Sequence, residues 1–335
     1  MLNVAVIGFG WWGRHICNRL GGHGEITVAC VAETQGSLHD EIRSKGLRVV
    51  STYEEALADD TIDAVVLTTP HMFHEEQVLA AVKAGKHVFC EKPLGLTAES
   101  ARRSVEACRS SGKVLGIGHE RRFEPAMQRL KSMIDAGELG TIMHAEAAFN
   151  HDKLSTIPTG GWRTDKTLSP GAGMTGMGIH LTDLFLWMFG PVASVQAQTR
   201  DRVLGWPTGD MVVAQISFAA GMTASLSAIL ITPHYMRYQV FGSRAWVEIR
   251  NTTHPDTPGG TTLFTVARKG DEPVTEELPW TDTVSANLEA FADSVTGRRA
   301  YPWTDEELIG NVALYEAIVK SADTNQTVSL RELRH

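Results

Sequence analysis

A glycine-spaced turn that follows a short apolar run near the N-terminus constrains the fold of this chain more than any other feature. Residues 4–7 are Val-Ala-Val-Ile, the composition of a buried parallel strand, and the turn after them has the spacing Gly8-x-Gly10-x-x-Gly13. In the dinucleotide fingerprint the first glycine permits a tight turn, the second lets backbone N–H groups approach a pyrophosphate, and the third lets the next helix pack closely. The expected helix, Arg14–Leu20, points its positive N-terminal end at the phosphates. We therefore predict a dinucleotide site, since the strand and the helix supply the context that the glycines alone would lack.

An acidic residue after the second expected strand indicates which dinucleotide this site holds. That strand is expected at Ile26–Ala32, and Glu33 follows it at the distance from Gly13 that the fingerprint requires. A carboxylate there accepts hydrogen bonds from the adenosine ribose hydroxyls and repels a 2′-phosphate. Residues 34–36 contain no Arg or Lys to hold such a phosphate. We predict NAD in preference to NADP, with a solvated acid at a strand end as the alternative interpretation of Glu33.

The composition excludes several classes of protein. At 335 residues the chain is long enough for two domains, and 43% apolar with 21% charged residues is ordinary for a soluble globular protein. The formal net charge of −8, without a long basic cluster, argues against a nucleic-acid partner. No apolar run reaches membrane-spanning length and the chain begins directly with a strand, so we expect no membrane partner and a cytoplasmic protein. Four cysteines without metal-type spacing predict reduced, buried thiols and no metal site: Cys17, Cys30, Cys90 and Cys108.

The chain up to about residue 118 alternates between expected strands and helices. Near-continuous apolar strands alternating with helices indicate a doubly wound parallel sheet, so we expect a Rossmann domain over residues 1–120. The expected strands are Val4–Ile7, Ile26–Ala32, Leu47–Ser51, Ala64–Thr68, His87–Cys90 and Val114–Ile117. The expected helices between them include His74–Ala84 and Ala98–Ser110.

After residue 118 the pattern changes, and we expect a second α/β domain over residues 121–335. From Val192 to Glu277 the sequence alternates between apolar and polar residues, which predicts a large, mostly antiparallel sheet. The expected strands are Ile142–Phe149, Val212–Phe218, Thr223–Leu230, Tyr238–Phe241, Trp246–Arg250 and Thr262–Val266. The expected helices are Phe123–Ala136, Met177–Phe189, Val284–Thr296 and Asp305–Ala322, the last with Thr304 as its N-cap.

Polar residues follow three strands of the first domain. Ligands of a doubly wound sheet bind beyond the carboxyl ends of its strands, so these residues are expected to face the same crevice as the glycine turn. They are Thr69, Pro70, His71 and His74 after the fourth strand, Glu91 and Lys92 after the fifth, and Glu120 after the sixth. Lys92 stands between an apolar strand and a proline, an unusual place for a solvated lysine, so we expect it to act in the site.

Four motifs, in this order and spacing, resemble those of the Gfo/Idh/MocA family, which is named for glucose–fructose oxidoreductase, inositol dehydrogenase and a rhizopine-catabolism protein. They are Gly8-x-Gly10-x-x-Gly13, Thr69-Pro70 with His74, Ala84-Gly85-Lys86-His87-Val88 leading into Glu91-Lys92-Pro93, and Gly178-x-His180-x-x-Asp183. Arg122-Phe123, Trp162-Arg163 and the last helix also resemble family positions, so the likeness covers nearly the whole chain. The Glu-Lys-Pro motif in this context is specific for the family but not for a substrate.

The resemblance implies a fold, an activity and a catalytic pair. It implies an N-terminal Rossmann domain and a C-terminal α/β domain whose mostly antiparallel open sheet binds substrate and often forms a homodimer or homotetramer interface. Family members usually oxidise a secondary alcohol of a sugar, cyclitol or related polyol, or reduce the ketone. Lys92 matches the family's catalytic lysine and His180 its acid/base. This division is chemically sound, because hydride removal needs the hydroxyl proton taken by a group that titrates near neutrality, and an ammonium stabilises the oxygen's negative charge.

One departure from the family concerns the residue four positions before His180. Many family dehydrogenases carry an Asp there, one helical turn away on the same face, whereas this chain has Gly176. The change removes a hydrogen-bond acceptor for substrate and a possible partner for Lys92, and it weakens assignment to inositol dehydrogenase itself. Asp183 could orient the His180 imidazole, or could pair elsewhere within the C-terminal domain.

The remaining expectations are residue sets and alternative functions. The expected cofactor residues are Gly8, Phe9, Gly10, Trp11, Trp12, Gly13, Glu33, Thr69, Pro70, His71, His74, Glu91 and Lys92. The expected substrate residues are Glu120, His151, Trp162, Arg163 and Asp183, and Arg163 could bind a carboxylate or form a structural ion pair. Besides an NAD-dependent dehydrogenase or reductase, two functions remain open. One is an enzyme that uses tightly bound NAD for transient oxidation with no net redox change, and the other is a dinucleotide-binding regulator without catalysis.

Overall fold

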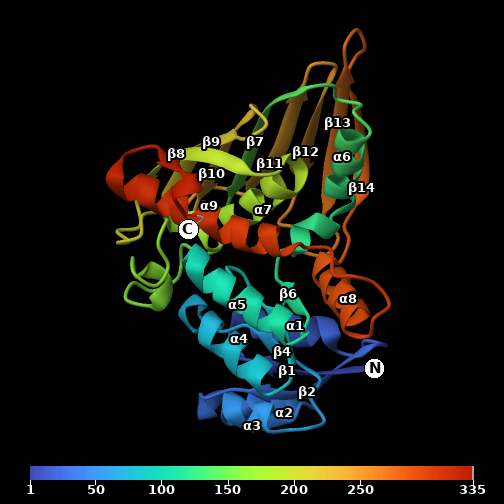
Figure 1. The fold of residues 1–335 in the computed structure, drawn as a ribbon, viewed down its shortest axis with the longest axis vertical. Coiled ribbons are helices and arrows are strands. Elements are labelled where there is room, and N and C mark those ends of the chain that lie inside the picture. The colour runs from blue at the N-terminus through green and yellow to red at the C-terminus, as the bar shows by residue number, and fades with distance from the viewer. Residues whose placement is uncertain (334–335) are drawn as a thin grey trace. The chain divides into compact units, whose positions relative to one another are not determined.

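The computed structural model describes residues 1–333, whose elements are drawn in Figure 1. Residues 334–335, the end of the expected second domain, lie outside this description. The chain forms two compact units: the first comprises Met1–Glu120 and Thr283–Ile309, and the second comprises Arg121–Asp282 and the chain from Gly310 onward. The first unit therefore contains a segment that the sequence had assigned to the second domain.

The first unit is built on the parallel sheet that the sequence predicts. Its strands run in the order β3-β2-β1-β4-β5-β6, and every neighbouring pair is parallel. This is the Rossmann order, with its switch point between β1 and β4. The strands are β1 (Leu2–Ile7), β2 (Ile26–Ala32), β3 (Val49–Val50), β4 (Ala64–Leu67), β5 (His87–Cys90) and β6 (Leu115–Ile117). The α-helices between them are α1 (Trp11–Leu20), α2 (His39–Ser44), α3 (Tyr53–Leu57), α4 (His74–Lys83) and α5 (Ala98–Ser110).

Side-chain caps and glycines define the ends of these helices. Thr97 accepts a hydrogen bond from the Ser100 N–H at 3.2 Å and so begins α5, and Thr52 begins α3 in the same way. Gly85, with a φ of 75°, follows α4 in the left-handed conformation that ends helices. Short 3₁₀ turns precede or follow the longer elements at η1 (Gly36–Leu38), η2 (His71–Phe73) and η3 (Glu120–Phe123).

Helix α8 (Thr283–Val295) corrects the expected domain boundary. Its apolar face, formed by Val284, Leu288, Phe291 and Ala292, belongs to the hydrophobic core that contains the residues of β1 and α1. The Phe291 ring also packs edge-on against Phe89 of β5, with centroids 5.6 Å apart. A late helix thus completes the core of the first unit, which a boundary read from the order of motifs does not reveal.

A polar contact fixes α8 against the last strand of the parallel sheet. The Asn287 side chain donates to the Ile117 carbonyl at 2.8 Å and accepts from the Tyr301 hydroxyl at 2.6 Å. The same hydroxyl accepts from the Ile117 N–H at 3.0 Å. These bonds satisfy buried polar groups at a sheet edge and position the segment that follows α8.

The second unit contains the large sheet that the sequence predicts. Its order is β14-β13-β12-β11-β7-β10-β9-β8-β15, and among the described strands only β7 and β10 pair in parallel. The strands are β7 (Ile142–Asn150), β8 (Val192–Arg200), β9 (Met211–Phe218), β10 (Thr223–Ile229), β11 (Tyr235–Gly242), β12 (Ala245–Asn251), β13 (Thr261–Arg268), β14 (Val274–Pro279) and β15 (Val328–Ser329). The edge strand β14 was not expected, because its mostly exposed Val-Thr-Glu-Glu-Leu-Pro sequence lacks the alternation that marks a half-buried strand.

Helices cover this sheet. The α-helices are α6 (Pro125–Asp135), α7 (Gly178–Phe189) and α9 (Asp305–Thr324), of which α9 belongs to this unit from Gly310 onward. Short turns are η4 (Trp162–Thr164), η5 (Ala172–Met174) and η6 (Leu330–Leu333). Helix α7 is almost wholly apolar and buried, and it packs against β7 and β10, in front of the strands in Figure 1. Helix α9 begins as predicted, because Thr304 accepts from the Glu307 N–H at 3.2 Å while the Glu307 carboxylate accepts from the Thr304 N–H at 2.9 Å.

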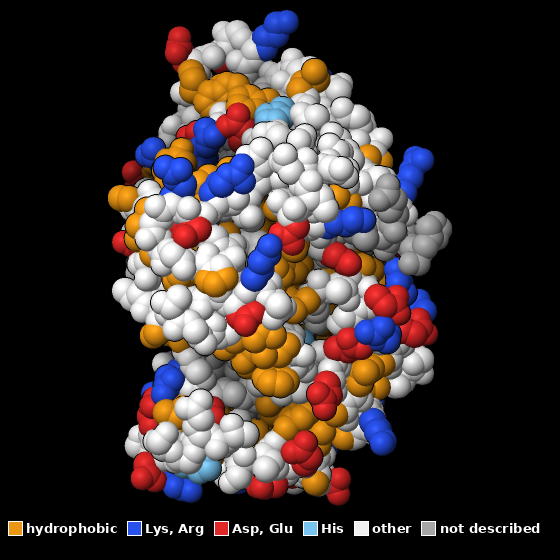
Figure 2. Space-filling model, turned by 90° about the vertical axis from the view of Figure 1, so that its left-hand side faces the viewer, with side chains coloured by type: hydrophobic (Ala, Val, Ile, Leu, Met, Phe, Trp, Pro, Cys, Tyr) orange, Lys and Arg blue, Asp and Glu red, His pale blue; other side chains and the backbone are white. Residues whose placement is uncertain are grey.

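Acidic and basic side chains are interspersed on the face of the molecule shown in Figure 2. Some of them form surface ion pairs, such as Arg129 with Glu276 at 2.8 Å. Within residues 1–333, no helix combines the length and apolarity needed to cross a bilayer, and no three His, Cys, Asp or Glu side chains are arranged to hold a metal ion. All four cysteines are buried and free.

Candidate functional site

The glycine turn after β1 has the geometry that its three glycines were expected to serve. A Cβ on Gly13 would lie 2.2 Å from the Gly8 carbonyl oxygen, closer than side chains approach, so α1 can pack this near the turn only with glycine. Gly8 has a φ of +90°, which also favours glycine. A Cβ on Gly10 would meet no atom within 4 Å, so the turn is open at that position. Thr68, directly after β4, donates its hydroxyl towards the carbonyls of Ile7 and Gly8 at 2.9 Å each.

Glu33 holds the same turn from the end of β2. One carboxylate oxygen accepts from the Phe9 N–H at 2.7 Å and the other from the Gln35 N–H at 2.8 Å. The side chain is buried, with 6% of the residue exposed. Since a carboxylate has about four acceptor sites, these two bonds leave acceptor capacity for ribose hydroxyls.

This turn fits a dinucleotide. Helix α1 starts directly after Gly10 and has no side-chain cap, so the backbone N–H groups of its first turn face outward with the positive end of the helix dipole. The open position at Gly10 leaves room for a phosphate close to the backbone. Of the other expected cofactor residues here, Phe9 is buried, Trp11 is 61% exposed, and Trp12 stacks on His15 at 4.7 Å. The residues present can therefore hold a pyrophosphate between the turn and α1.

The segment after β4 holds its own backbone together. His74 is fully buried, and its ring nitrogens lie 2.7 Å from the Pro93 carbonyl oxygen and 3.0 Å from the Thr69 carbonyl oxygen. Burial lowers the pKa of His74, while the two carbonyls oppose that shift. A neutral ring donates to one of these two carbonyls, and either bond helps to tie the turn after β4 to the Lys92-Pro93 segment. Thr69 and Pro70 are partly exposed, and His71 is buried at the start of η2.

Two buried glutamates accompany Lys92 after β5 and β6. Glu91 is 7% and Glu120 is 3% exposed. Burial and, to a smaller extent, the charge of Glu120 raise the pKa of Glu91 to about 8, and the Lys92 ammonium opposes both. Gly118 makes room for the Glu91 carboxylate, because a Cβ there would lie 2.4 Å from its Oε2. Lys92 is partly exposed, and its N–H donates to the same oxygen at 3.3 Å. The first unit therefore carries a lysine and two buried carboxyls at the carboxyl ends of its strands.

In the second unit, His180 and Asp183 both lie on α7 and are buried. Asp183 forms a bidentate ion pair with the buried Arg122, at 2.8 Å and 2.7 Å. Of the two roles open for Asp183, the structure shows the pairing within its own unit, and a carboxylate with two such bonds keeps further acceptor capacity. His180 lies near Phe149 of β7, with ring centroids 6.2 Å apart.

His151 belongs to a group of histidines at one end of the large sheet. It follows β7 directly, His234 precedes β11 and His254 follows β12. The His254 ring lies 5.1 Å from His151 and 6.2 Å from His234, centroid to centroid. Burial lowers the pKa of His151 to about 4 and that of His254 to about 3, so both are neutral at physiological pH.

The hydrogen bonds of this group fix the tautomers of two rings. His151 Nδ1 accepts from the Lys153 N–H at 3.2 Å, and His254 Nδ1 accepts from the Asp256 N–H at 3.3 Å. The proton of each neutral ring is therefore on Nε2, where it can be donated. Beside them, the fully buried Arg121 donates to Asp256 at 2.5 Å and lies 5.8 Å from the Phe149 ring.

Trp162 and Arg163 form a cation–π pair in η4, with the guanidinium carbon 4.1 Å from the ring centroid. Burial lowers the pKa of Arg163 to about 10, and no carboxylate pairs with this guanidinium within the described residues. Of its two expected roles, a structural ion pair is absent from the described part of the chain. Gly176 lies before α7, where a Cβ would come within 3.1 Å of the Leu154 side chain.

Two domain profiles match the sequence. The N-terminal one, described as an oxidoreductase family with an NAD-binding Rossmann fold, matches residues 2–119, and the C-terminal domain of the Gfo/Idh/MocA oxidoreductases matches residues 127–248. The chain belongs to the Gfo/Idh/MocA family. It is thus an NAD(P)-dependent oxidoreductase, as the resemblance implied.

Members of the Gfo/Idh/MocA family resemble this chain over most of its length. 1,5-Anhydro-D-fructose reductase of Ensifer adhaerens is 28% identical over 84% of each chain. A D-xylose 1-dehydrogenase (NADP(+)) of Haloferax volcanii is 29% identical over 83% of this chain and 84% of its own. Levoglucosan dehydrogenase, solved with NADH and L-sorbose, has the same fold, with a TM-score of 0.87, 19% identity and full coverage of both chains.

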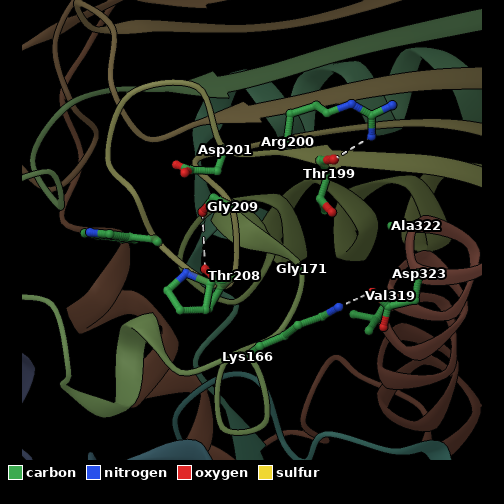
Figure 3. Close-up of a pocket in the computed structure, with 12 residues that line it drawn as sticks. Lys166, Gly171, Thr199, Arg200, Asp201, Thr208, Gly209, Val319, Ala322 and Asp323 are labelled. Carbon is green, nitrogen blue, oxygen red and sulfur yellow. Dashed lines mark hydrogen bonds and ion pairs between the residues drawn. The ribbon is translucent and has the colours of Figure 1, made fainter.

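A pocket of about 250 Å³ in the second unit contains none of the expected site residues (Figure 3). Lys166 and Asp323 meet across it in an ion pair of 2.7 Å. Its other walls come from the residue before η5, the end of β8, the following loop and α9: Gly171, Thr199, Arg200, Asp201, Trp206, Pro207, Thr208, Gly209, Val319 and Ala322. This pocket is separate from the family motifs.

Several residues that shape these sites were not among the expected ones. Thr68 could have been found, because it directly precedes Thr69 at a strand end. Glu41 pairs with Arg14 from α2, a helix of six residues whose sequence carries little periodicity. His234 and His254 stand outside any family motif quoted for this chain, and their one signal is their position near strand ends.

Proposed function

We propose that this family member is an NAD-dependent dehydrogenase or reductase that moves a hydride between the nicotinamide and a secondary alcohol or ketone of a sugar, cyclitol or related polyol. The observation that carries the proposal is the joining of the open glycine turn and Lys92 at the carboxyl ends of one parallel sheet, with Glu91 and Glu120 buried beside the lysine. The relatives are named for their action on 1,5-anhydro-D-fructose, D-xylose and levoglucosan, and these names support a sugar-like substrate.

Lys92 and His180 are proposed as the polarising and the acid/base residue. When bound, NAD supplies the acceptor for the hydride that leaves the carbinol carbon. Neutral His180 takes the hydroxyl proton as the C–O bond becomes a carbonyl, and in the reverse direction it returns that proton. The Lys92 ammonium stabilises negative charge on the same oxygen. The proposed substrate ligands are Glu120, His151, Trp162, Arg163 and Asp183. The proposed cofactor residues are those of the glycine turn with Glu33, Thr69, Pro70, His71, His74, Glu91 and Lys92.

NAD is proposed in preference to NADP because of Glu33. Its carboxylate is fixed by Phe9 and Gln35, so it cannot swing away from a 2′-phosphate without losing two hydrogen bonds. We further propose that the first unit binds the cofactor, that the second binds substrate and forms a homodimer or homotetramer through its sheet, and that the protein works in the cytoplasm.

The experiment is a screen of sugars, sugar acids and inositols with NAD⁺, followed by the absorbance of NADH. We expect NADH to accumulate in amounts that match the substrate consumed. Product formation without NADH would favour transient oxidation with no net redox change, and the absence of any turnover with intact dinucleotide binding would favour a regulator.

Two variants test the roles of the residues. Lys92→Ala should abolish turnover and leave NAD⁺ binding intact, and His180→Ala should lower kcat by roughly 10²- to 10⁴-fold. Lys83→Ala on the exposed end of α4 and His144→Ala on β7 are the matched controls. Near-normal turnover of either catalytic variant would remove that residue from the mechanism. Glu33→Ala should lower the affinity for NAD⁺ and so reduce the difference between the affinities for NAD⁺ and NADP⁺. Equal affinities for the two dinucleotides in the unmodified chain would refute the preference for NAD⁺.

A further inference from the structure

We propose that Glu41 determines cofactor specificity by holding the Arg14 guanidinium away from a ribose 2′-phosphate. The inference rests on the proposed function, since it requires a dinucleotide at the glycine turn. It assigns a role to a residue of α2 that no motif of the sequence contains.

Arg14 is well placed to meet the adenosine end of a dinucleotide. It directly follows Gly13 on α1, and its guanidinium lies over the Phe9 ring, 4.9 Å from the centroid. Phe9 is the residue whose N–H binds Glu33. The nearby charge of Glu33 also contributes to raising the pKa of Arg14, so the guanidinium and the ribose-binding carboxylate are neighbours.

The Glu41 carboxylate binds both N–H groups on one side of this guanidinium. Its two oxygens accept from Nε and Nη2 of Arg14 at 2.7 Å each, the parallel geometry in which arginine also binds phosphate. The side chains are 33% and 39% exposed, so the pair is accessible to solvent and can open without unfolding the unit. The other cation that affects Glu41, Lys45, donates to Asn18 at 3.2 Å.

The charges around the turn explain why this pairing excludes NADP. With Glu41 bound to it, the Arg14 guanidinium is neutralised by its own partner, and the Glu33 carboxylate is left to repel a 2′-phosphate. Without the Glu41 charge, Arg14 balances Glu33 and presents two guanidinium N–H groups to an anion. A phosphate hydrogen-bonded in this bidentate way is among the strong charge-assisted contacts.

The test compares NAD⁺ and NADP⁺ affinities by quenching of tryptophan fluorescence or by calorimetry. Glu41→Gln keeps the shape of the side chain and removes its charge. We expect NADP⁺ to bind at least about tenfold more tightly to this variant, with NAD⁺ unchanged within about twofold. Adding Arg14→Met to Glu41→Gln should abolish the gain, because the phosphate then has no guanidinium to bind.

Glu75→Gln is the matched control, since it removes the same charge from another bidentate arginine pair of this unit, the one with Arg103, away from the glycine turn. It should change neither affinity. An unchanged NADP⁺ affinity in a Glu41→Gln protein that still binds NAD⁺ overturns the inference, as does a gain that survives Arg14→Met. An unmodified chain that binds NADP⁺ as tightly as NAD⁺ overturns it too. A chain that binds neither dinucleotide overturns the proposed function, and this inference with it.

Discussion

Replacing Gly13 by Ala tests the reason that the glycine turn needs its third glycine. The added Cβ would lie 2.2 Å from the Gly8 carbonyl oxygen and 2.9 Å from the Thr68 hydroxyl. This carbonyl is part of the Gly8 backbone, and the Gly8 N–H donates to the Ala32 carbonyl at 2.9 Å. The Gly8 carbonyl therefore cannot move aside as a flexible side chain would. An ordinary contact requires the turn and α1 to separate by about 1 Å.

Overpacking of this kind costs about 1–3 kcal/mol, and we expect the upper part of that range because the obstructing atom is backbone. Separation of α1 from β1 also displaces the N–H groups proposed to hold the pyrophosphate. Gly13→Ala should therefore lose about 2–3 kcal/mol of unfolding free energy in the transition of the first unit and bind NAD⁺ at least about tenfold more weakly.

Gly10→Ala provides the contrast, because its Cβ meets no protein atom within 4 Å. Its φ of −66° is open to alanine, so stability should stay within about 0.5 kcal/mol while NAD⁺ affinity falls. The assays are urea denaturation followed by circular dichroism and NAD⁺ titration of each variant. A Gly13→Ala protein as stable as the unmodified chain would refute the packing argument, and normal NAD⁺ binding by Gly10→Ala would refute the phosphate argument.

Three further predictions concern charge in and near the sites. Because the raised pKa of Glu91 favours its neutral form, the folded chain binds more protons than the unfolded chain between about pH 4.3 and pH 8, and its free energy of unfolding falls as the pH rises through that range. Glu91→Gln should flatten this slope in pH-dependent denaturation, and an unaltered slope would show that Glu91 is not its source. Arg163→Leu should raise KM for anionic substrates at least about tenfold and leave neutral polyols unaffected, and an equal effect on both would exclude an anion-binding role. Gly176→Asp has room if Leu154 shifts slightly, and it should lower kcat/KM for an anionic natural substrate, whereas a clear increase would show that the family's Asp is a lost catalytic group.

The first unit follows closely from its sequence because each of its rules is local. Strand β1, the glycine turn and Glu33 are contiguous or separated by one strand–helix unit, and the parallel order brings all carboxyl ends to one edge of the sheet. The boundaries of β2, β5 and α5 agree with the sequence to the residue. What the sequence did not show is where buried polar groups find backbone partners: the His74 ring nitrogens lie beside the carbonyl oxygens of Pro93 and Thr69.

Asp183 shows how far from a motif residue its partner can lie in the sequence. Three residues from His180 on the same helix, it had the position of a residue that orients an imidazole. Its partner Arg122 lies 61 positions earlier, and the two bury a bidentate pair that neither local pattern announces. An unpaired carboxylate at that depth would be costly, so the pair is required once the chain brings the two residues into the same interior.

The second unit resists prediction for a reason built into antiparallel sheets. In a parallel sheet, all strands end on the same side of the sheet, so a search of the residues after each strand finds the site. In the large sheet β7 and β12 end where β11 begins. The same end of the sheet therefore holds residues that follow some strands and residues that precede others. His151 follows its strand and was found, whereas His234 precedes its strand and was missed. His254 follows β12 by three residues, and only the return of β11 beside β7 brings it within 5.1 Å of His151. A search of both ends of each expected strand, once the sheet was expected to be antiparallel, would have put all three histidines among the candidates.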